Sequence, residues 1–486
     1  MIPAADILQR ALESRDARFD GVFFVGVTST NIYCRPICPA RVSYASHRRF
    51  FDTAGAAERA GYRPCLRCRP ELAPGLAVCD AVSQLARAAA LRIAAGALNG
   101  GSVSSLAREL DVSERHLRRA MERELGVSPI DLAQTHRLLL AKKLLGETAL
   151  PVTRIAYASG FQSLRRFNSV FRERYALAPS AVRRARTAAG DEVRLSLGYR
   201  APFAWSSLLE ALRREAVPGV ETVRGAAYSR TVQIDGHSGV IVVRDDSGGG
   251  PRGARVPKTQ LSVSVSPELL PALMPLLARL RRLFDLDSEP LVVDAHLAMS
   301  GLKSLVRRRP GLRAPGAFDG FEAALGTLAG GPARANRANR ARLAGVVAAL
   351  GEPIETGDPA ITHIMPTAKQ ICGAGEARLR ALGVDAAAGG AIVQIARETI
   401  AGRLVLDPSA DEAATLRALT EIDGVTERAA REIVMRALHG PDAFPAAARA
   451  VAEAAERWRP WRAYAAWHLR LNESSGKSRK TAMRAE

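Results

Sequence analysis

Four cysteines in two close pairs place the tightest constraint on what the start of this chain can fold into. Cys34 and Cys38 have three residues between them, Cys65 and Cys68 have two, and 26 residues separate the pairs. Two such pairs can surround one tetrahedral ion with four sulfurs, the ligand set that Zn²⁺ favours. The spacing predicts a zinc site and leaves open whether the site is only structural. We expect the nearby arginines to offset the charge of the thiolates: Arg35, Arg41, Arg48, Arg49, Arg63, Arg67 and Arg69.

The charge of the chain is concentrated in its first 186 residues. The whole sequence has a formal net charge of +20, and residues 1–186 hold 29 basic and 16 acidic residues, a net of +13. With 47% hydrophobic and 24% charged residues, the composition excludes a disordered chain. A basic excess of this kind predicts a polyanionic partner, and double-stranded DNA is the first candidate.

The sequence shows no membrane span and no export signal. No apolar run approaches the roughly 18 residues that a membrane span needs, and Asp6 already interrupts the start. We therefore expect a cytoplasmic protein without a membrane partner.

Residues 80–185 read as helices, and two segments within them have the layout of a helix-turn-helix. In the first, Leu106, Ala107 and Leu110 form an apolar face, Asp111-Val112 makes the turn and Ser113 caps a second helix. The second repeats this order around Gly160. Short basic helices of this kind read base edges in the major groove, although a solvated Arg-rich face is the alternative. The predicted DNA-binding residues are Ser113, Arg115, His116, Arg118, Arg119, Gln162, Ser163, Arg165 and Arg166.

The pattern changes to strands after Glu192 and back to helices after Pro267. VRLSLGY, GVETVRG, AYSRTVQI, GVIVVRDD and LSVSV are β-prone and separated by turn residues. Helical composition then continues to about Arg470. This order predicts an α+β subdomain followed by an all-α domain.

DARFDGVFFVGVTSTNIYCRPICPAR, continuing to FFDTAGAAERAGYRPCLRCRPE, resembles the zinc-binding domain of the Ada family of alkylation-repair proteins over residues 12–72. The resemblance implies zinc held by Cys34, Cys38, Cys65 and Cys68. It also implies that Cys34 is the nucleophile that takes a methyl group from a DNA methylphosphotriester. Residues 85–186 resemble the AraC-type regulator domain, which follows the cysteine domain in Ada-type proteins. No Pro-Cys-His-Arg sequence is present, so we expect no repair of O6-methylguanine.

Residues 193 to about 470 resemble AlkA-type 3-methyladenine DNA glycosylases with a helix-hairpin-helix fold. The departures from that family fall at its functional positions. Its Leu-Pro-Gly-Ile-Gly hairpin reads Ile-Asp-Gly-Val-Thr here, leaving Gly424 and Thr426 as weak candidates for a phosphate contact. Its catalytic Asp corresponds to Ala448, which cannot stabilise the positive charge that develops on the sugar. We therefore expect a degenerate glycosylase, with rescue by a nearby carboxylate such as Asp442 or Glu453 as the alternative.

The predicted fold class is a multidomain α+β chain: a small zinc-binding α/β domain, an all-α double helix-turn-helix domain, and an α+β subdomain with an all-α helix-hairpin-helix glycosylase fold. The expected domains are residues 1–78 (Ada-like), 79–188 (AraC-type), 192–288 (AlkA-like α+β), 289–472 (helix-hairpin-helix) and a disordered basic tail, 473–486.

These features predict a protein of the alkylation damage response. A zinc-bound Cys34 would take methyl from DNA methylphosphotriesters in a single turnover, and this would switch on binding to promoter DNA and transcription of repair genes. The expected cofactor is Zn²⁺, and the partners are methylated DNA, promoter DNA and RNA polymerase. Two alternatives remain open: a bifunctional enzyme that also excises 3-methyladenine-type bases, and a zinc-stabilised regulator without transferase activity.

Overall fold

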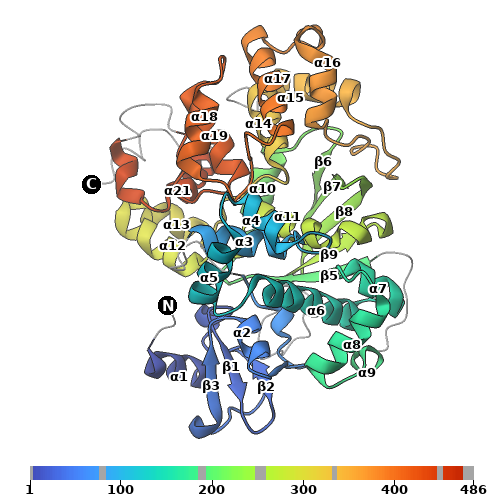
Figure 1. Ribbon diagram of the computed structural model, residues 1–486. Coiled ribbons are helices and arrows are strands. Elements are labelled where there is room, and N and C mark those ends of the chain that lie inside the picture. The colour runs from blue at the N-terminus through green and yellow to red at the C-terminus, as the bar shows by residue number, and fades with distance from the viewer. Residues whose placement is uncertain are drawn as a thin grey trace. The chain divides into compact units, whose positions relative to one another are not determined.

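The chain packs as two compact units in the computed structural model, which describes residues 4–75, 84–183, 193–246, 259–330, 337–445 and 453–473 (Figure 1). The first unit comprises Met1–Arg200, Asp246–Ala278 and Leu286–Ser288. The second comprises Ala201–Asp245, Arg279–Asp285 and Glu289–Glu486.

The first unit begins with a four-stranded sheet whose order is β3-β1-β2-β4. β1 pairs antiparallel with β2 and β3, whereas β2 and β4 run parallel. Aromatic side chains form its core, and Phe23 and Tyr33 are fully buried. The elements of this region are α1 (Ala5–Glu13), β1 (Phe24–Val27), β2 (Ile32–Cys34), β3 (Arg48–Phe51), α2 (Ala54–Arg59) and β4 (Arg63–Pro64), with 3-10 turns at Ala17–Phe19, Ala45–His47 and Pro70–Leu72.

Helices follow, and serine caps fix where four of them begin. The hydroxyls of Ser102, Ser113, Ser128 and Ser163 each accept the backbone N–H three residues further on, which satisfies one free donor of the first turn. Gly126, at φ +67°, ends one helix and allows the next to start at Pro129. The helices are α3 (Gln84–Ala94), α4 (Val103–Glu109), α5 (Glu114–Leu125), α6 (Pro129–Glu147), α7 (Val152–Ala158), α8 (Leu164–Tyr175) and α9 (Pro179–Val182).

The first unit also contains an antiparallel strand pair from further along the chain. β5 (Val193–Gly198) pairs with β9 (Gln260–Val265), and Val193 lies opposite Val265. A 3-10 helix at Pro267–Ala272 leads into α11 (Leu273–Leu283), within which the boundary between the units falls.

The second unit combines an antiparallel meander with helices. β7 pairs with both β6 and β8. Its elements are α10 (Trp205–Glu215), β6 (Glu221–Arg224), β7 (Ala227–Ile234), β8 (His237–Asp245), α12 (Pro290–Leu297), a π-helical turn (Ala298–Leu302), α13 (Lys303–Arg308), α14 (Gly320–Gly330), α15 (Arg337–Leu350), α16 (Ala368–Ala381), α17 (Ala386–Ile400), α18 (Glu412–Thr420), α19 (Glu427–Ala437), a 3-10 turn (Glu456–Trp458) and α21 (Arg462–Glu473).

The mixed α+β organisation predicted from the sequence is confirmed, and the five β-prone segments after Glu192 are strands β5–β9. The two compact units do not coincide with the expected domain ranges, because β5 and β9 belong to the same unit as the first half of the chain. The tail expected at 473–486 lies outside the described residues from 474 onward. Within the described parts of the chain, no helix combines the length and hydropathy that a membrane span requires.

Candidate metal centre and DNA interface

The sheet of the first unit brings the two cysteine pairs together. β2 and β4 are parallel neighbours, with Tyr33 opposite Pro64, so Cys34 and Cys65 leave the sheet at the same end. The Cys65 N–H donates to the Tyr33 carbonyl at 2.9 Å, and the Cys38 N–H donates to the Arg35 carbonyl at 3.1 Å. The four Sγ atoms of Cys34, Cys38, Cys65 and Cys68 all lie within 4.8 Å of one another.

The donor set fits a zinc ion. Hydrogen bonding to Cys38 and to the other two thiols, together with burial, raises the pKa of Cys34 well above its ordinary value. Four sulfurs this close can all be ionised only if a cation offsets their mutual repulsion. Four thiolates at tetrahedral reach are the ligand set of a structural or reactive zinc site. The four cysteines would therefore hold Zn²⁺.

The four cysteines are not equivalent. Cys38, Cys65 and Cys68 are buried residues, whereas Cys34 is a partly exposed one. Backbone N–H groups point at two of the buried sulfurs: Arg67 N to Cys65 Sγ at 3.3 Å and Arg35 N to Cys68 Sγ at 3.4 Å. Among the described residues, Cys34 Sγ receives no such bond. Since a hydrogen bond to a thiolate withdraws electron density, the sulfur of Cys34 is less quenched than those of Cys65 and Cys68.

A buried ion pair supports the cysteine loop from behind. The Arg35 guanidinium donates Nε–H to Asp20 Oδ1 at 2.7 Å and a second N–H to Asp20 Oδ2. It also donates to the Cys68 carbonyl at 3.1 Å. Arg35 and Asp20 are 7% and 4% exposed, so this pair is shielded from solvent screening.

The expectation that seven arginines offset the thiolate charge needs correction for two of them. Arg69 is taken by Glu71 and Glu147, and Arg48 binds the Ser43 carbonyl and Glu13. Local carboxylates and carbonyls compete for these guanidinium groups. Arg35 is also paired with a carboxylate, that of Asp20, but its guanidinium contacts the Cys68 carbonyl as well.

The helix-turn-helix residues lie mostly at the surface. α4 buries Leu106 and Ala107, and α7 buries Ile155 and Ala156, as expected. The exposed candidates on or just before α5 and α8 are Ser113, Arg115, His116, Arg119, Gln162, Ser163, Arg165 and Arg166.

Several of the candidate side chains already have partners within the protein. Arg118 forms an ion pair with Glu114 one turn earlier, at 2.6 Å. Ser113 and Ser163 serve as helix caps. Gln162 lies before α8 and not on it, and its amide donates to the Asn99 carbonyl at 2.6 Å. The sequence pattern alone could not show these local contacts.

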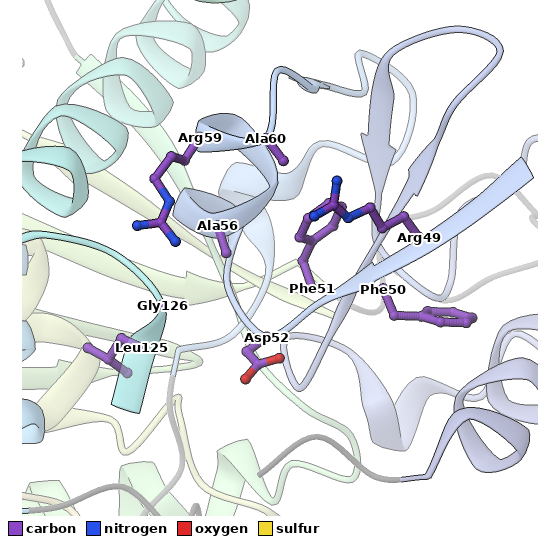
Figure 2. Close-up of a pocket in the computed structure, with 9 residues that line it drawn as sticks. All are labelled: Arg49, Phe50, Phe51, Asp52, Ala56, Arg59, Ala60, Leu125 and Gly126. Carbon is purple, nitrogen blue, oxygen red and sulfur yellow. The ribbon is translucent and has the colours of Figure 1, made fainter. Parts of the chain in front are cut away.

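A pocket of about 360 Å³ opens where β3 and α2 meet the end of α5 (Figure 2). Arg49 lies over the Phe51 ring, 5.2 Å from its centroid, and Asp52 and Arg59 also line the pocket. Since no cysteine borders it, we assign it no role in methyl transfer.

In the second unit, Asp442 is fully engaged. Arg459 contacts its carboxylate at 2.5 Å and Arg462 at 2.8 Å and 3.0 Å, and Arg462 also binds the Asp442 carbonyl. A carboxylate neutralised by two guanidinium groups is poorly suited to stabilise a further cation. Ala448 lies outside the described residues, and Glu453 has a partner.

The helix-hairpin-helix candidates occupy a well-formed turn. Gly424 has φ +85°, and a Cβ there would lie 2.4 Å from the Ala387 carbonyl oxygen, so only glycine fits. Thr426 caps α19 and accepts the Ala429 N–H at 3.2 Å. Both roles are local, and the exposed Asp423 is the nearest charge in the turn.

Sequence reasoning missed the polar groups buried between the metal domain and α6. Glu58 accepts hydrogen bonds from Tyr33 and Thr135, each at 3.0 Å. Lys142 binds Glu71 and donates to the Cys65 carbonyl at 3.2 Å. No local pattern distinguishes these residues from solvated ones, because their partners come from distant parts of the chain.

Comparison with known proteins gives three family matches. Residues 8–71 match the metal binding domain of Ada, residues 106–185 a helix-turn-helix domain, and residues 194–319 the AlkA N-terminal domain. The chain is 35% identical to a probable bifunctional transcriptional activator/DNA repair enzyme AlkA of Mycobacterium tuberculosis, covering 95% of both chains.

Two further relatives each match one part of the chain. The DNA-3-methyladenine glycosylase 2 of Escherichia coli is 29% identical over 57% of this chain and 97% of its own length. The bifunctional transcriptional activator/DNA repair enzyme AdaA of Bacillus subtilis is 28% identical over 36% of this chain and 80% of its own length.

Proposed function

The chain belongs to the family of bifunctional transcriptional activator/DNA repair proteins, and from that premise we propose that Cys34 takes methyl groups from DNA methylphosphotriesters. The observation that carries this proposal is the asymmetry of the four-cysteine centre. Cys34 is its one partly exposed residue, while its three companions are buried.

The chemistry follows from the thiolate. Zinc, when bound, keeps the cysteines deprotonated at neutral pH, where a free thiol with a pKa near 8.5 is only a few per cent ionised. The Cys34 sulfur attacks the methyl carbon in line, an S–C bond forms, and the C–O bond breaks. The electron pair leaves with the phosphodiester, a stable anion that needs no general acid. Because the thioether product is not readily reversed, each chain reacts once.

Methylation changes the charge near DNA. Four thiolates and one Zn²⁺ carry −2, and methylation of one sulfur leaves −1. One unit less repulsion toward a phosphate at roughly 8 Å, with an effective dielectric of 20 to 40, contributes about 1 to 2 kcal/mol. That corresponds to about a fivefold to thirtyfold tighter complex. We propose this as the switch that turns repair into transcriptional activation.

DNA recognition by the methylated protein would use the exposed residues on and before α5 and α8. The helix-turn-helix match supports DNA as the partner. Arg115, Arg119, Arg165 and Arg166 are exposed cations at the positions where a reading helix contacts bases and phosphates. Activation of transcription would further require contact with RNA polymerase.

For the AlkA-like half we propose DNA or partner binding without base excision. By position in the sequence, Ala448 corresponds to the expected catalytic carboxylate, and Asp442 is neutralised by Arg459 and Arg462. The alternative, an active glycosylase, is favoured by the similarity to DNA-3-methyladenine glycosylase 2.

The first proposal is tested with zinc-loaded protein and DNA that contains methylphosphotriesters. Peptide mass spectrometry should find one added methyl group, on the Cys34 peptide only. Cys372→Ala, which removes a cysteine outside the centre, should react like the natural protein. A methyl on another cysteine would contradict the role of Cys34, and no methyl at all would favour the purely zinc-stabilised regulator.

The second proposal is tested by base release from methylated duplex DNA, with the E. coli glycosylase as a positive control. We expect no release by this chain and measurable DNA binding. Release of alkylated purines at a rate near that of the control would establish the alternative.

A further inference from the structure

We infer that Arg200, a residue of the AlkA-like half, is a positioning residue for the methyl-acceptor centre. The inference rests on the proposed methyl transfer at Cys34. It adds that the centre is held in its reactive arrangement by a group that lies beyond the two regulatory domains in the sequence.

Arg200 is buried at the junction of three chain segments of the first unit. It is 3% exposed, and its guanidinium donates to three backbone carbonyls: Asp20 at 3.1 Å, Asp287 at 2.6 Å and Gly75 at 3.1 Å. The planar guanidinium suits such divergent acceptors, because its N–H groups leave in fixed directions. Asp20 lies within the metal domain, Gly75 lies after its last cysteine, and Asp287 belongs to the AlkA-like half.

The contact with Asp20 leads directly to the cysteines. The Asp20 carboxylate holds Arg35, which follows Cys34 in the chain. The Arg35 side chain binds the Cys68 carbonyl, and its backbone N–H donates to Cys68 Sγ. Arg200 therefore fixes the backbone of the residue that orients Arg35. Without it, the Asp20 peptide can move, and the position of the Cys34 turn relative to Cys68 is less constrained.

Close backbone approach shows that this junction is tightly packed. A Cβ on Gly21 would lie 2.3 Å from the Pro74 carbonyl oxygen and 3.2 Å from an Arg200 nitrogen. A Cβ on Gly198, two residues before Arg200, would lie 2.1 Å from the Leu72 carbonyl oxygen. Glycine at these positions allows the metal domain and the AlkA-like segments of the first unit to meet without an intervening side chain.

Strand β5, which leads to Arg200, is also attached to the central helix of the helix-turn-helix domain. The Ser196 N–H donates to Glu147 Oε2 at 2.9 Å, and Lys143 donates to the Ser196 carbonyl. Glu147 in turn binds Arg69 of the metal domain at 2.5 Å. Contacts with both regulatory domains thus hold the segment that leads to Arg200. The backbone position of Arg200 is fixed as a result.

The test uses the full-length chain with Arg200→Gln, Arg200→Lys and the control Arg194→Gln, which removes an exposed arginine from the preceding strand. The first readout is the single-turnover rate of Cys34 methylation per zinc-loaded molecule. We expect Arg200→Gln to slow it about tenfold, because the hydrogen bond from the charged guanidinium to the Asp20 carbonyl is lost. Arg200→Lys, which keeps the charge but not the fork, should be intermediate, and Arg194→Gln should equal the natural protein.

The second readout is the absorption spectrum and the affinity of Co²⁺ bound in place of zinc. A changed centre should shift the cobalt bands in Arg200→Gln but not in Arg194→Gln. Equal rates and equal cobalt spectra in all four proteins would overturn the inference, even if Arg200→Gln is less stable. If the natural protein accepts no methyl, the proposed function fails, and the cobalt readout still decides whether Arg200 positions the cysteines. If Arg200→Gln does not fold, the methylation rate and the cobalt spectrum are measured on Arg200→Lys instead.

Discussion

The ammonium group of Lys142 on α6 donates a hydrogen bond to the carbonyl of Cys65, with 3.2 Å between Nζ and O. The central helix of the DNA-binding domain thus touches the loop that carries a metal ligand. Lys142 is 4% exposed and also binds Glu71, so this contact lies inside the first unit.

We expect Lys142→Met to lower the free energy of unfolding by about 3 kcal/mol or more, because it leaves the buried Glu71 carboxylate with Arg69 alone. Urea unfolding of the zinc-loaded protein measures this loss. The double variant Lys142→Met/Glu71→Gln should recover part of it. A double variant as unstable as the sum of the two single ones would argue against direct coupling.

Glu58 should make the first unit less stable as the pH rises. Burial raises the pKa of Glu58 from 4.5 to about 7, even though Arg174, Lys142 and hydrogen bonds from Tyr33 and Thr135 favour its ionised form. The folded state then binds more protons than the unfolded state between these two values. The free energy of unfolding should therefore fall across pH 4.5 to 7, by about 3 kcal/mol at most.

Glu58→Gln should flatten that slope, whereas Glu109→Gln, at an exposed position, should leave it unchanged. Urea midpoints at intervals between pH 5 and 8 provide the comparison. An equal slope in Glu58→Gln would mean that another group controls the pH dependence.

Two glycines of the metal domain allow the cost of backbone strain to be measured apart from the cost of a steric clash. Gly21 and Gly61 have similar φ values, +81° and +89°, but a Cβ on Gly21 would meet a backbone oxygen, whereas a Cβ on Gly61 would have no atom within 4 Å. Gly61→Ala should cost about 1 kcal/mol of stability from strain alone. Gly21→Ala should cost about 3 kcal/mol or more, because the Pro74 carbonyl must move. Thermal unfolding of the zinc-loaded variants checks this order.

Arg119 and Arg118 should differ in DNA binding although they are neighbours on α5. Arg119 is exposed, while Glu114 pairs with Arg118. Arg119→Gln should reduce the slope of log affinity against log salt concentration by about one. Arg118→Gln should reduce it less. DNA titrations between low and physiological salt measure both slopes. Identical slopes would show that the ion pair with Glu114 does not weaken the contact of Arg118 with DNA.

Asp442→Asn should destabilise the second unit by about 1 to 3 kcal/mol, because it weakens the bonds to Arg459 and Arg462. The exposed Glu421→Gln is the control. Base release should be absent before and after the change. If the natural protein does release base and Asp442→Asn abolishes that release, Asp442 is the missing carboxylate.

The cysteine centre, the helix pairs and the strands could be predicted because each depends on short-range patterns. The spacing of the cysteines from Cys34 to Cys68 predicts the metal site. Ser113 and Gly160 mark the turns of the two helix-turn-helix segments. Residues such as Leu106 and Ile155 repeat at helical intervals and are buried as expected.

Arg200, Asp20 and Glu58 could not be predicted, because their roles depend on partners far away in the sequence. Asp20 and Arg200 are 180 residues apart, and Glu58 and Thr135 are 77 apart. In the sequence alone, each of these three residues looks like a charged residue on the protein surface. Only the fold shows that burial and a specific acceptor or donor give it a different function.

The chain passes back and forth between its two units, and this limits how recombination can exchange its parts. The polypeptide leaves the first unit after Arg200, returns at Asp246, and returns again for Leu286–Ser288. A single recombination breakpoint at residues 184–192 would exchange β5, Arg200 and Asp287 together with the glycosylase-like half. A foreign replacement would then have to supply an arginine in register with Asp20 and a glycine opposite Leu72. We therefore expect the two halves to evolve together, although their sequences resemble separate domains.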